Sequence, residues 1–138
     1  IQSFSGEFGL DQMLVDTNFL ACLLPNTQAT KGILNFRVFN KMPQGSYVLN
    51  AGRGSQLVEL DLLQALDNGQ IRGAALDVFE TEPLPTSHPF WTDKRILLTP
   101  HHAAEVYLPA VVKTFLDNIY RSRNNEPLIG LVDEELGY

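Results

Sequence analysis

Four short runs of largely apolar residues constrain the fold of this chain more than any other feature. They cover residues 18–24 (NFLACLL), 47–50 (YVLN), 71–79 (IRGAALDVF) and 95–99 (RILLT). Apolar residues occupy successive positions in these runs rather than alternate ones, which is typical of strands buried on both faces of a parallel sheet. Pro25 stops the first run, and the turn residues Pro43 and Gly45 precede the second.

Amphipathic segments separate the runs and predict helices between the strands. The expected helices cover residues 9–15, residues 36–42 after Asn35 as N-cap, residues 59–67 before Asn68-Gly69, and a last segment that begins near Pro109. The last helix carries one apolar stripe, which consists of Val112, Phe115, Leu116 and Ile119. This alternation predicts an α/β fold with a doubly wound parallel sheet and right-handed crossovers. Residues 124–138 are polar and acidic, as in a tail or a docking arm.

Charge and composition narrow the class of protein. The net charge of −6 and the scattered basic residues argue against a nucleic-acid partner. The apolar run at residues 19–24 is far too short to span a bilayer, so no membrane segment is expected. A single cysteine, Cys22, excludes an internal disulfide, suits a buried position and fits a cytoplasmic protein. Because the first residue is Ile1 rather than methionine, we expect the later part of a longer protein.

Polar residues follow the strand runs where a parallel sheet would gather them. Arg53, Glu82 and His101 each come just after a different run, and ligands bind beyond the carboxyl ends of parallel strands. Arginine can clamp a carboxylate through two hydrogen bonds, and histidine can transfer a proton near neutral pH. A carboxylate beside the imidazole would hold it protonated and oriented. The set suits redox chemistry at a carbon that bears a carboxylate; the alternative is a capping arginine, a loop glutamate and a structural histidine.

Two other motifs are weaker. Residues 52–57 (GRGSQL) imitate a dinucleotide phosphate loop, with Asp77 lying 77 − 54 = 23 residues beyond its second glycine. Leu57 stands where the third glycine belongs, so we predict no phosphate loop within the chain. His101 and His102 are adjacent, but no third ligand with zinc spacing accompanies them. We therefore predict no metal site.

The strand-end segments together resemble the D-isomer-specific 2-hydroxyacid dehydrogenase family. The matching pieces are LLPNTQATKGILN, MPQGSYVLNAGRGSQLVELDLLQALDNGQIRGAALDVFETEPL and ILLTPHHAA, so the resemblance covers residues 17–104. It implies that residues 1–104 are the C-terminal half of a Rossmann-type NAD(P)-binding domain, with the phosphate loop upstream. Residues 105–138 would form a helix and tail that return to a substrate domain outside the chain. Half of such a sheet would leave an unpaired edge and an uncovered apolar face.

The resemblance also implies roles for individual residues. The implied catalytic residues are Arg53 for the substrate carboxylate and carbonyl, Glu82 to pair with the histidine, and His101 as general acid and base. The implied cofactor-binding residues are Pro25, Thr27, Ala51, Gly52, Arg53, Asp77, His101 and Ala103. Asp77 would hold the nicotinamide carboxamide; the alternative is that its carboxylate only satisfies loop amides.

The neighbours of these residues are expected to have ordinary structural roles. We predict that Glu80 is solvated, that His88 lies in a loop, and that Phe90 and Trp91 pack under that loop. His102 stands where the family usually has an aliphatic residue, and we predict an exposed ring or one that lies behind the ligand-contacting residues.

The activity implied by the resemblance is the reduction of small 2-oxo acids, glyoxylate and hydroxypyruvate first, to 2-hydroxy acids. The cofactor would be NADP or NAD, with NADPH favoured, and the protein would be a homodimer. One alternative is another family member, of the phosphoglycerate, erythronate or lactate type. A second alternative is a non-enzymatic, dinucleotide-sensing module that binds a partner on the same fold.

Overall fold

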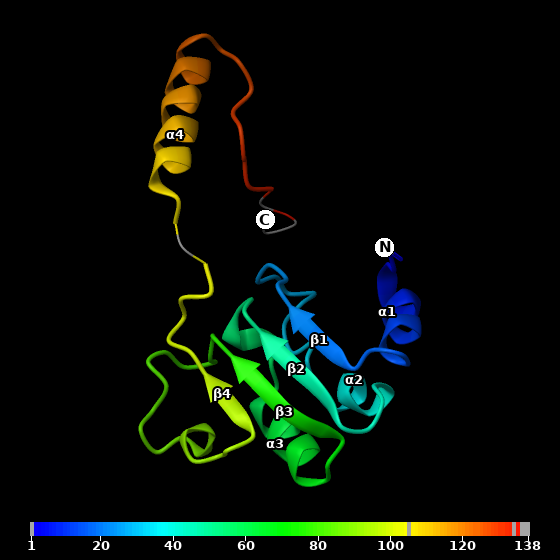
Figure 1. Cartoon of the computed structure of the whole chain (residues 1–138). Helices are drawn as coiled ribbons and strands as arrows, with labels where there is room; N and C mark the ends of the chain where they lie inside the picture. Colours follow the sequence, from blue (N-terminus) through cyan, green and yellow to red (C-terminus); the bar gives the residue numbers. More distant parts are fainter. Residues whose placement is uncertain (1, 105, 134, 136–138) are drawn as a thin grey trace.

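The computed structural model describes residues 2–104, 106–133 and 135, and its strands form a parallel sheet (Figure 1). The strands are β1 (Phe19–Cys22), β2 (Ser46–Asn50), β3 (Ile71–Leu76) and β4 (Ile96–Leu98), in the order β1-β2-β3-β4. Each expected apolar run contains one strand, so the predicted sheet is confirmed. Strands β1, β3 and β4 are shorter than their runs, because the last residues of these runs already turn into the loops at the carboxyl edge, whereas β2 begins one residue before its run and ends with it.

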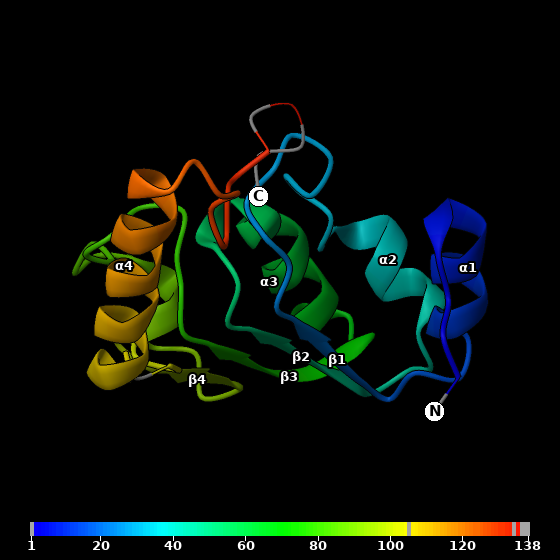
Figure 2. The same ribbon diagram turned by 90° about the horizontal axis from the view of Figure 1, so that it is seen from above.

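Three helices pack beside the sheet. They are α1 (Gly6–Leu14), α2 (Phe36–Lys41) and α3 (Glu59–Asp67); α2 and α3 lie on one face of the sheet, and α1 lies beside α2 (Figure 2). The Asn35 side chain accepts the backbone N–H of Val38, as expected of an N-cap. Gly69, just after the C-cap of α3, has a φ of +75° that suits glycine. The helices and the sheet enclose a core whose largest fully buried side chains include Leu14, Phe39, Leu62, Ile71 and Leu76.

The opposite face of the sheet is apolar and open. Exposed fractions on this face reach 76% for Phe19 and 64% for Leu97. The rings of Phe19 and Tyr47 stack there, with their centroids 5.0 Å apart. An uncovered apolar face is what half of a doubly wound sheet predicts, and the sequential strand order is that of one half of a Rossmann sheet. The expected fold class is therefore confirmed.

Helix α4 (Leu108–Arg123) extends away from the sheet (Figure 1). None of its residues is buried, and the expected apolar stripe faces open space, with Phe115 65% exposed. The following segment folds back onto α4, because Asn118 both donates to the Ile129 carbonyl and accepts the Ile129 N–H, at 3.0 and 2.8 Å. The expected tail is thus in part a docked arm; its residues 134 and 136–138 lie outside the described residues. In the described part of the chain no helix has the length and apolarity needed to cross a membrane.

Candidate active site

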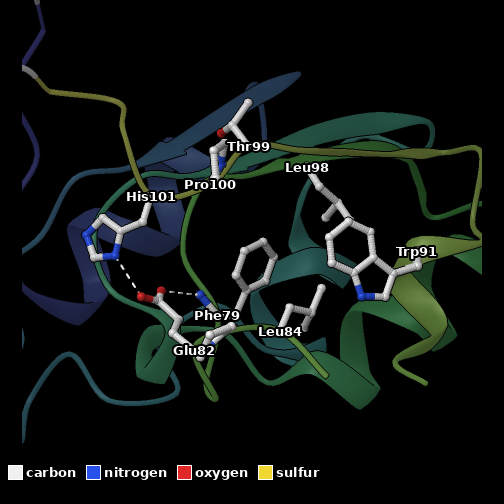
Figure 3. A pocket seen from close by; sticks show the side chains of 9 residues that line it. Phe79, Glu82, Leu84, Trp91, Leu98, Thr99, Pro100 and His101 are labelled. Atoms are coloured by element: carbon white, nitrogen blue, oxygen red, sulfur yellow. Dashed lines mark hydrogen bonds and ion pairs between the residues drawn. The ribbon is translucent and has the colours of Figure 1, made fainter. Parts of the chain in front are cut away.

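His101 and Glu82 form a hydrogen-bonded pair just beyond the carboxyl ends of β3 and β4. The His101 Nδ1 atom lies 2.8 Å from Glu82 Oε2 (Figure 3). The hydrogen bond from His101, the Phe79 N–H at 3.0 Å and the positive charge of Arg53 lower the pKa of Glu82. An ionised carboxylate only accepts hydrogen bonds, so the Nδ1 atom carries the proton in this pair. Within the described residues the Nε2 atom has no hydrogen-bond partner, and it is therefore the nitrogen that remains for a ligand.

The backbone of His101 is held in an unusual conformation. Its φ of +53° lies in the left-handed region, which costs a residue other than glycine about 1–3 kcal/mol. The carboxylate of Asp77 fixes this loop, because it accepts the Thr99 hydroxyl at 2.5 Å and the backbone N–H groups of His102 and Ala103 at 3.0 and 2.9 Å. Asp77 therefore fixes the main-chain position from which the His101 side chain extends.

The contacts of Asp77 fit the alternative role expected for it, in which its carboxylate accepts hydrogen bonds from loop N–H groups. Its side chain is buried, which opposes its charge, but the Thr99 hydroxyl and the two loop N–H groups outweigh this effect and lower the pKa of Asp77. A carboxylate offers about four acceptor positions, and three of them are used within the described residues. A contact with a nicotinamide carboxamide stays a prediction for the remaining position.

Asp77→Asn is expected to lower the free energy of unfolding by about 2 kcal/mol, because an amide has one acceptor oxygen where three donors converge. The pKa of Asp77 is depressed in the folded state. Its contribution is therefore present above the ordinary carboxyl pKa and is lost as pH falls through the folded value. Thermal unfolding of the full-length protein should show the gap between parent and variant closing below about pH 4. A gap that is the same at every pH would contradict this role.

Arg53 lies at the start of the short 3-10 helix η1 (Gly54–Gln56). Its Nη1 atom donates to the Gly52 carbonyl at 2.7 Å, and its side chain is exposed. Gly54 explains how this loop comes close to Glu82: a Cβ atom at Gly54 would lie 1.8 Å from the Phe79 carbonyl oxygen. The glycine of the GRG motif therefore allows two loops to touch, and Arg53 lies near enough to Glu82 for its charge to help lower the pKa of that carboxyl.

The expected cofactor-binding residues lie at the same edge of the sheet. The Pro25 carbonyl accepts from the Thr30 hydroxyl at 2.6 Å, and the hydroxyls of Thr27 and Thr30 are 3.2 Å apart. The Ala51 N–H donates to the carbonyl of Cys22 at 3.1 Å, which ties the ends of β1 and β2 together. Main-chain groups and hydroxyls at this edge suit a ribose and a carboxamide, and a contact of the nicotinamide ring with residues 51–52 stays a prediction.

A cavity of about 610 Å³ opens beside the histidine–carboxylate pair. Figure 3 shows His101 and Glu82 at one end of this cavity and Trp91 at the other. Most of its lining is apolar; the residues are Phe79, Glu82, Pro83, Leu84, Trp91, Leu98, Thr99, Pro100 and His101. Arg53 is absent from this lining, because its guanidinium folds back onto the Gly52 carbonyl.

The expectation that Trp91 packs under its loop is wrong. Its side chain is 55% exposed and lines the cavity, and its indole N–H donates to the Pro85 carbonyl at 2.9 Å. Phe90 is 1% exposed, as predicted, because the short helical turn η2 (Pro89–Trp91) directs adjacent side chains to different sides. His88 lies in the loop as expected, where its Nε2 atom contacts Glu59 Oε2 at 3.2 Å.

The remaining neighbours match their predictions. Glu80 and His102 are exposed, and Cys22 is buried. Three polar residues were not singled out from the sequence: Thr99, Asn50 and Gln56. Asn50 and Gln56 are fully buried and hydrogen-bonded to the Arg53 loop. In the sequence, Asn50 is marked by being a polar residue at the end of an apolar run. Gln56 is marked only by being a polar residue directly before Leu57.

Comparison with known proteins gives consistent matches along the chain. The family model for "D-isomer specific 2-hydroxyacid dehydrogenase, NAD binding domain" matches residues 3–103. Glyoxylate/hydroxypyruvate reductase A of Photorhabdus laumondii is 47% identical over all 138 residues, and the enzyme of that name from Klebsiella pneumoniae strain 342 is 44% identical. The chain spans 44% of the length of each of these relatives.

Solved structures show the same similarity. One is an NADPH-dependent glyoxylate/hydroxypyruvate reductase from Sinorhizobium meliloti in complex with NADP and sulfate, with a TM-score of 0.90 and 40% identity. That match covers 97% of this chain and 44% of the other. Another is a D-isomer specific 2-hydroxyacid dehydrogenase from Xanthobacter autotrophicus Py2 in complex with NADPH and MES, with a TM-score of 0.94 and 35% identity. It covers 98% of this chain and 56% of the other.

Proposed function

The chain belongs to the D-isomer specific 2-hydroxyacid dehydrogenase family, and from this premise we propose that its protein reduces small 2-oxo acids with NAD(P)H. Glyoxylate and hydroxypyruvate are the first candidate substrates, because the relatives at 43–47% identity carry the name glyoxylate/hydroxypyruvate reductase A. The observation that carries the proposal is the His101–Glu82 pair, at 2.8 Å beside the cavity. A histidine with one nitrogen held by a carboxylate and the other left for a ligand suits proton transfer to a substrate oxygen.

His101 is the proton donor in the proposed reduction. Its Nδ1 atom keeps its hydrogen, which is hydrogen-bonded to Glu82 throughout, while its Nε2–H transfers to the carbonyl oxygen that becomes the hydroxyl group. The ionised Glu82 stabilises the positive charge of the imidazolium before the transfer and keeps the ring oriented. When bound, the reduced nicotinamide supplies the hydride that the carbonyl carbon accepts.

Arg53 recognises the acid group of the substrate in this proposal. A guanidinium can bind a carboxylate through two parallel hydrogen bonds and polarise the neighbouring carbonyl. Its Nη1 atom is satisfied by the Gly52 carbonyl, so substrate binding would turn the exposed side chain toward the cavity. Most of the lining beside His101 is apolar, and closure of such a site over the substrate would keep water away from the reacting carbon.

The residues at the carboxyl edge fit one part of a dinucleotide. Pro25 and Thr27 would line the adenosine and ribose side, and Ala51 and Gly52 would lie beneath the nicotinamide ring. The Ala103 N–H donates to the Oδ2 atom of Asp77 at 2.9 Å, and both residues would face the carboxamide. NADPH is favoured over NADH because the Sinorhizobium and Xanthobacter structures are described with NADP and NADPH.

The proposal includes the organisation of the longer protein. Residues 1–104 form the C-terminal half of the NAD(P)-binding domain, and residues 105–138 contribute to the substrate domain. The exposed stripe on α4 supports this division, because a helix without a buried residue needs a partner surface. We further propose that the protein acts as a homodimer in the cytoplasm.

The isolated 138-residue segment is expected to show no glyoxylate-dependent oxidation of NADPH, while the full-length protein turns over. The reason is that the segment has no phosphate-binding glycine loop and leaves one face of its sheet uncovered. Absorbance of NADPH under steady-state conditions measures both samples. Turnover by the segment alone would contradict this prediction.

The same assay on the full-length protein tests the proposed function. Turnover with glyoxylate and hydroxypyruvate, and little with the 2-oxo acids that correspond to phosphoglycerate, erythronate or lactate, is the expected profile. A preference for one of those substrates would favour another family member. Binding of NADPH without turnover of any 2-oxo acid would favour the dinucleotide-sensing module instead.

A further inference from the structure

Gln56 is a fully buried polar side chain whose contacts reach two different loops. It is 0% exposed. Its Oε1 atom accepts the Arg53 N–H at 2.8 Å and the Cys22 thiol at 3.3 Å. Its Nε2 atom donates to the carbonyls of Leu24 and Pro25, at 2.8 and 2.9 Å. Both hydrogens and both acceptor positions of the carboxamide are therefore used.

The two loops have different tasks in the proposed function. The loop after β1 carries Pro25 and Thr27, on the cofactor side, whereas the loop after β2 carries Arg53, on the oxo-acid side. Asn50 holds the same Arg53 peptide from its other end, because its Nδ2 atom donates to the Arg53 carbonyl at 3.0 Å. The main chain of Arg53 is thus fixed at both its N–H and its carbonyl. Of the two side-chain amides, that of Gln56 also bonds to the loop after β1, whereas that of Asn50 bonds within the loop after β2.

We propose that Gln56 is a positioning residue that couples cofactor binding to oxo-acid binding in this protein. This inference rests on the proposed function and deepens it. One carboxamide sets the position of the Leu24–Pro25 carbonyls and the direction in which the Arg53 side chain leaves the main chain. Loss of that carboxamide therefore disturbs both ligands, although Gln56 touches neither.

The surroundings explain why an amide is required. A Cβ atom at Gly52 would lie 2.2 Å from the Gln56 Oε1 atom, so the space around the carboxamide is closed. Methionine has a similar length but forms none of the four hydrogen bonds. Glutamate has the same shape, but an ionised carboxylate has no hydrogen to donate to the two carbonyls.

Gln70 provides a matched control. Its Nε2 atom also donates to two backbone carbonyls, those of Phe39 and Met42, at 2.8 and 2.9 Å. It lies directly before β3, at the amino end of the sheet and away from the candidate site. Gln70→Met therefore removes a similar carbonyl-bridging amide without touching either loop.

The experiment compares Gln56→Met and Gln70→Met in the full-length protein. For Gln56→Met we expect the KM for glyoxylate and the Kd for NADPH each to rise about tenfold, the effect of losing one or two hydrogen bonds. The kcat at saturation should fall less, because the His101–Glu82 pair is unchanged. For Gln70→Met we expect a lower Tm, with KM and Kd within about twofold of the parent. A Gln56→Met protein that loses only Tm, like the control, would overturn the proposal.

Gln56→Glu supplies a second readout should Gln56→Met not fold. A neutral carboxyl group can donate one hydrogen bond to the carbonyls and a carboxylate none. The ratio of the variant's NADPH Kd to that of the parent should therefore increase as pH rises. A ratio that stays constant with pH contradicts the proposal. If the parent reduces no 2-oxo acid, the proposed function fails, whereas the NADPH Kd values of the variants still decide whether Gln56 positions the loops.

Discussion

His101→Ala is expected to lower kcat for glyoxylate reduction in the full-length protein by about 10²- to 10⁴-fold, the usual contribution of a positioned general acid. His102→Ala should change kcat less than about threefold, because its ring is exposed and its hydrogen bond to Asp77 comes from the backbone N–H, which alanine keeps. The two histidines are adjacent and differ in what they contact. Only His101 has its Nδ1 atom on Glu82, at 2.8 Å.

Steady-state kinetics of both variants, with thermal unfolding as a control for folding, measures this difference. The pair is well matched, since each change removes one imidazole from the same loop. Equal losses of kcat would show that the choice of His101 is wrong. A loss confined to KM would mean that His101 binds the substrate without transferring its proton.

Arg53→Lys is expected to lower kcat/KM for the oxo acid by about 10- to 100-fold, mainly through KM. Lysine keeps the positive charge, but it cannot form two parallel hydrogen bonds with a carboxylate. Because Gln56 and Asn50 hold the main chain of residue 53, the replacement leaves the loop in place. The loss therefore reports on the guanidinium itself.

Arg95→Lys is the control for this prediction. Arg95 lies just before β4, at the opposite end of the sheet, where its guanidinium binds Asp93 and Asp67 at 2.6 and 2.8 Å. The same chemical change there should leave KM and kcat unchanged. If Arg53→Lys also leaves both constants unchanged, Arg53 has no role in substrate binding.

Much of the fold could be predicted because its signals are local. A continuous apolar run indicates a buried strand wherever it occurs, and Asn35 and Asn68-Gly69 mark helix ends through contacts with their own neighbours. The residue after a parallel strand must lie at the carboxyl edge. For that reason Arg53, Glu82 and His101 could be grouped before any distance was known.

For Trp91 and Asp77, the sequence did not determine which of two possible roles each residue has. An aromatic residue in a loop can pack inward or line a cavity, and the short turn Pro89–Trp91 places Phe90 inside and Trp91 outside. A carboxylate after a strand can face a ligand or bind loop N–H groups. The donors that surround Asp77 come from residues 99–103, which are more than twenty positions away.

By itself, the sequence determined the order of strands and helices and the edge at which the polar residues gather, and its resemblance to the family named His101 and Glu82 as the histidine and carboxylate that form a pair. Only the tertiary structure decided how those residues are held. It shows that Asp77 fixes the loop of His101, that Gly54 lets two loops touch, and that Gln56 joins the loops after β1 and β2. The physical reason is the distance along the sequence over which each kind of interaction acts. Periodicity and capping depend on residues within one or two turns, whereas these hydrogen bonds join groups far apart in sequence, and their geometry exists only once the sheet has formed.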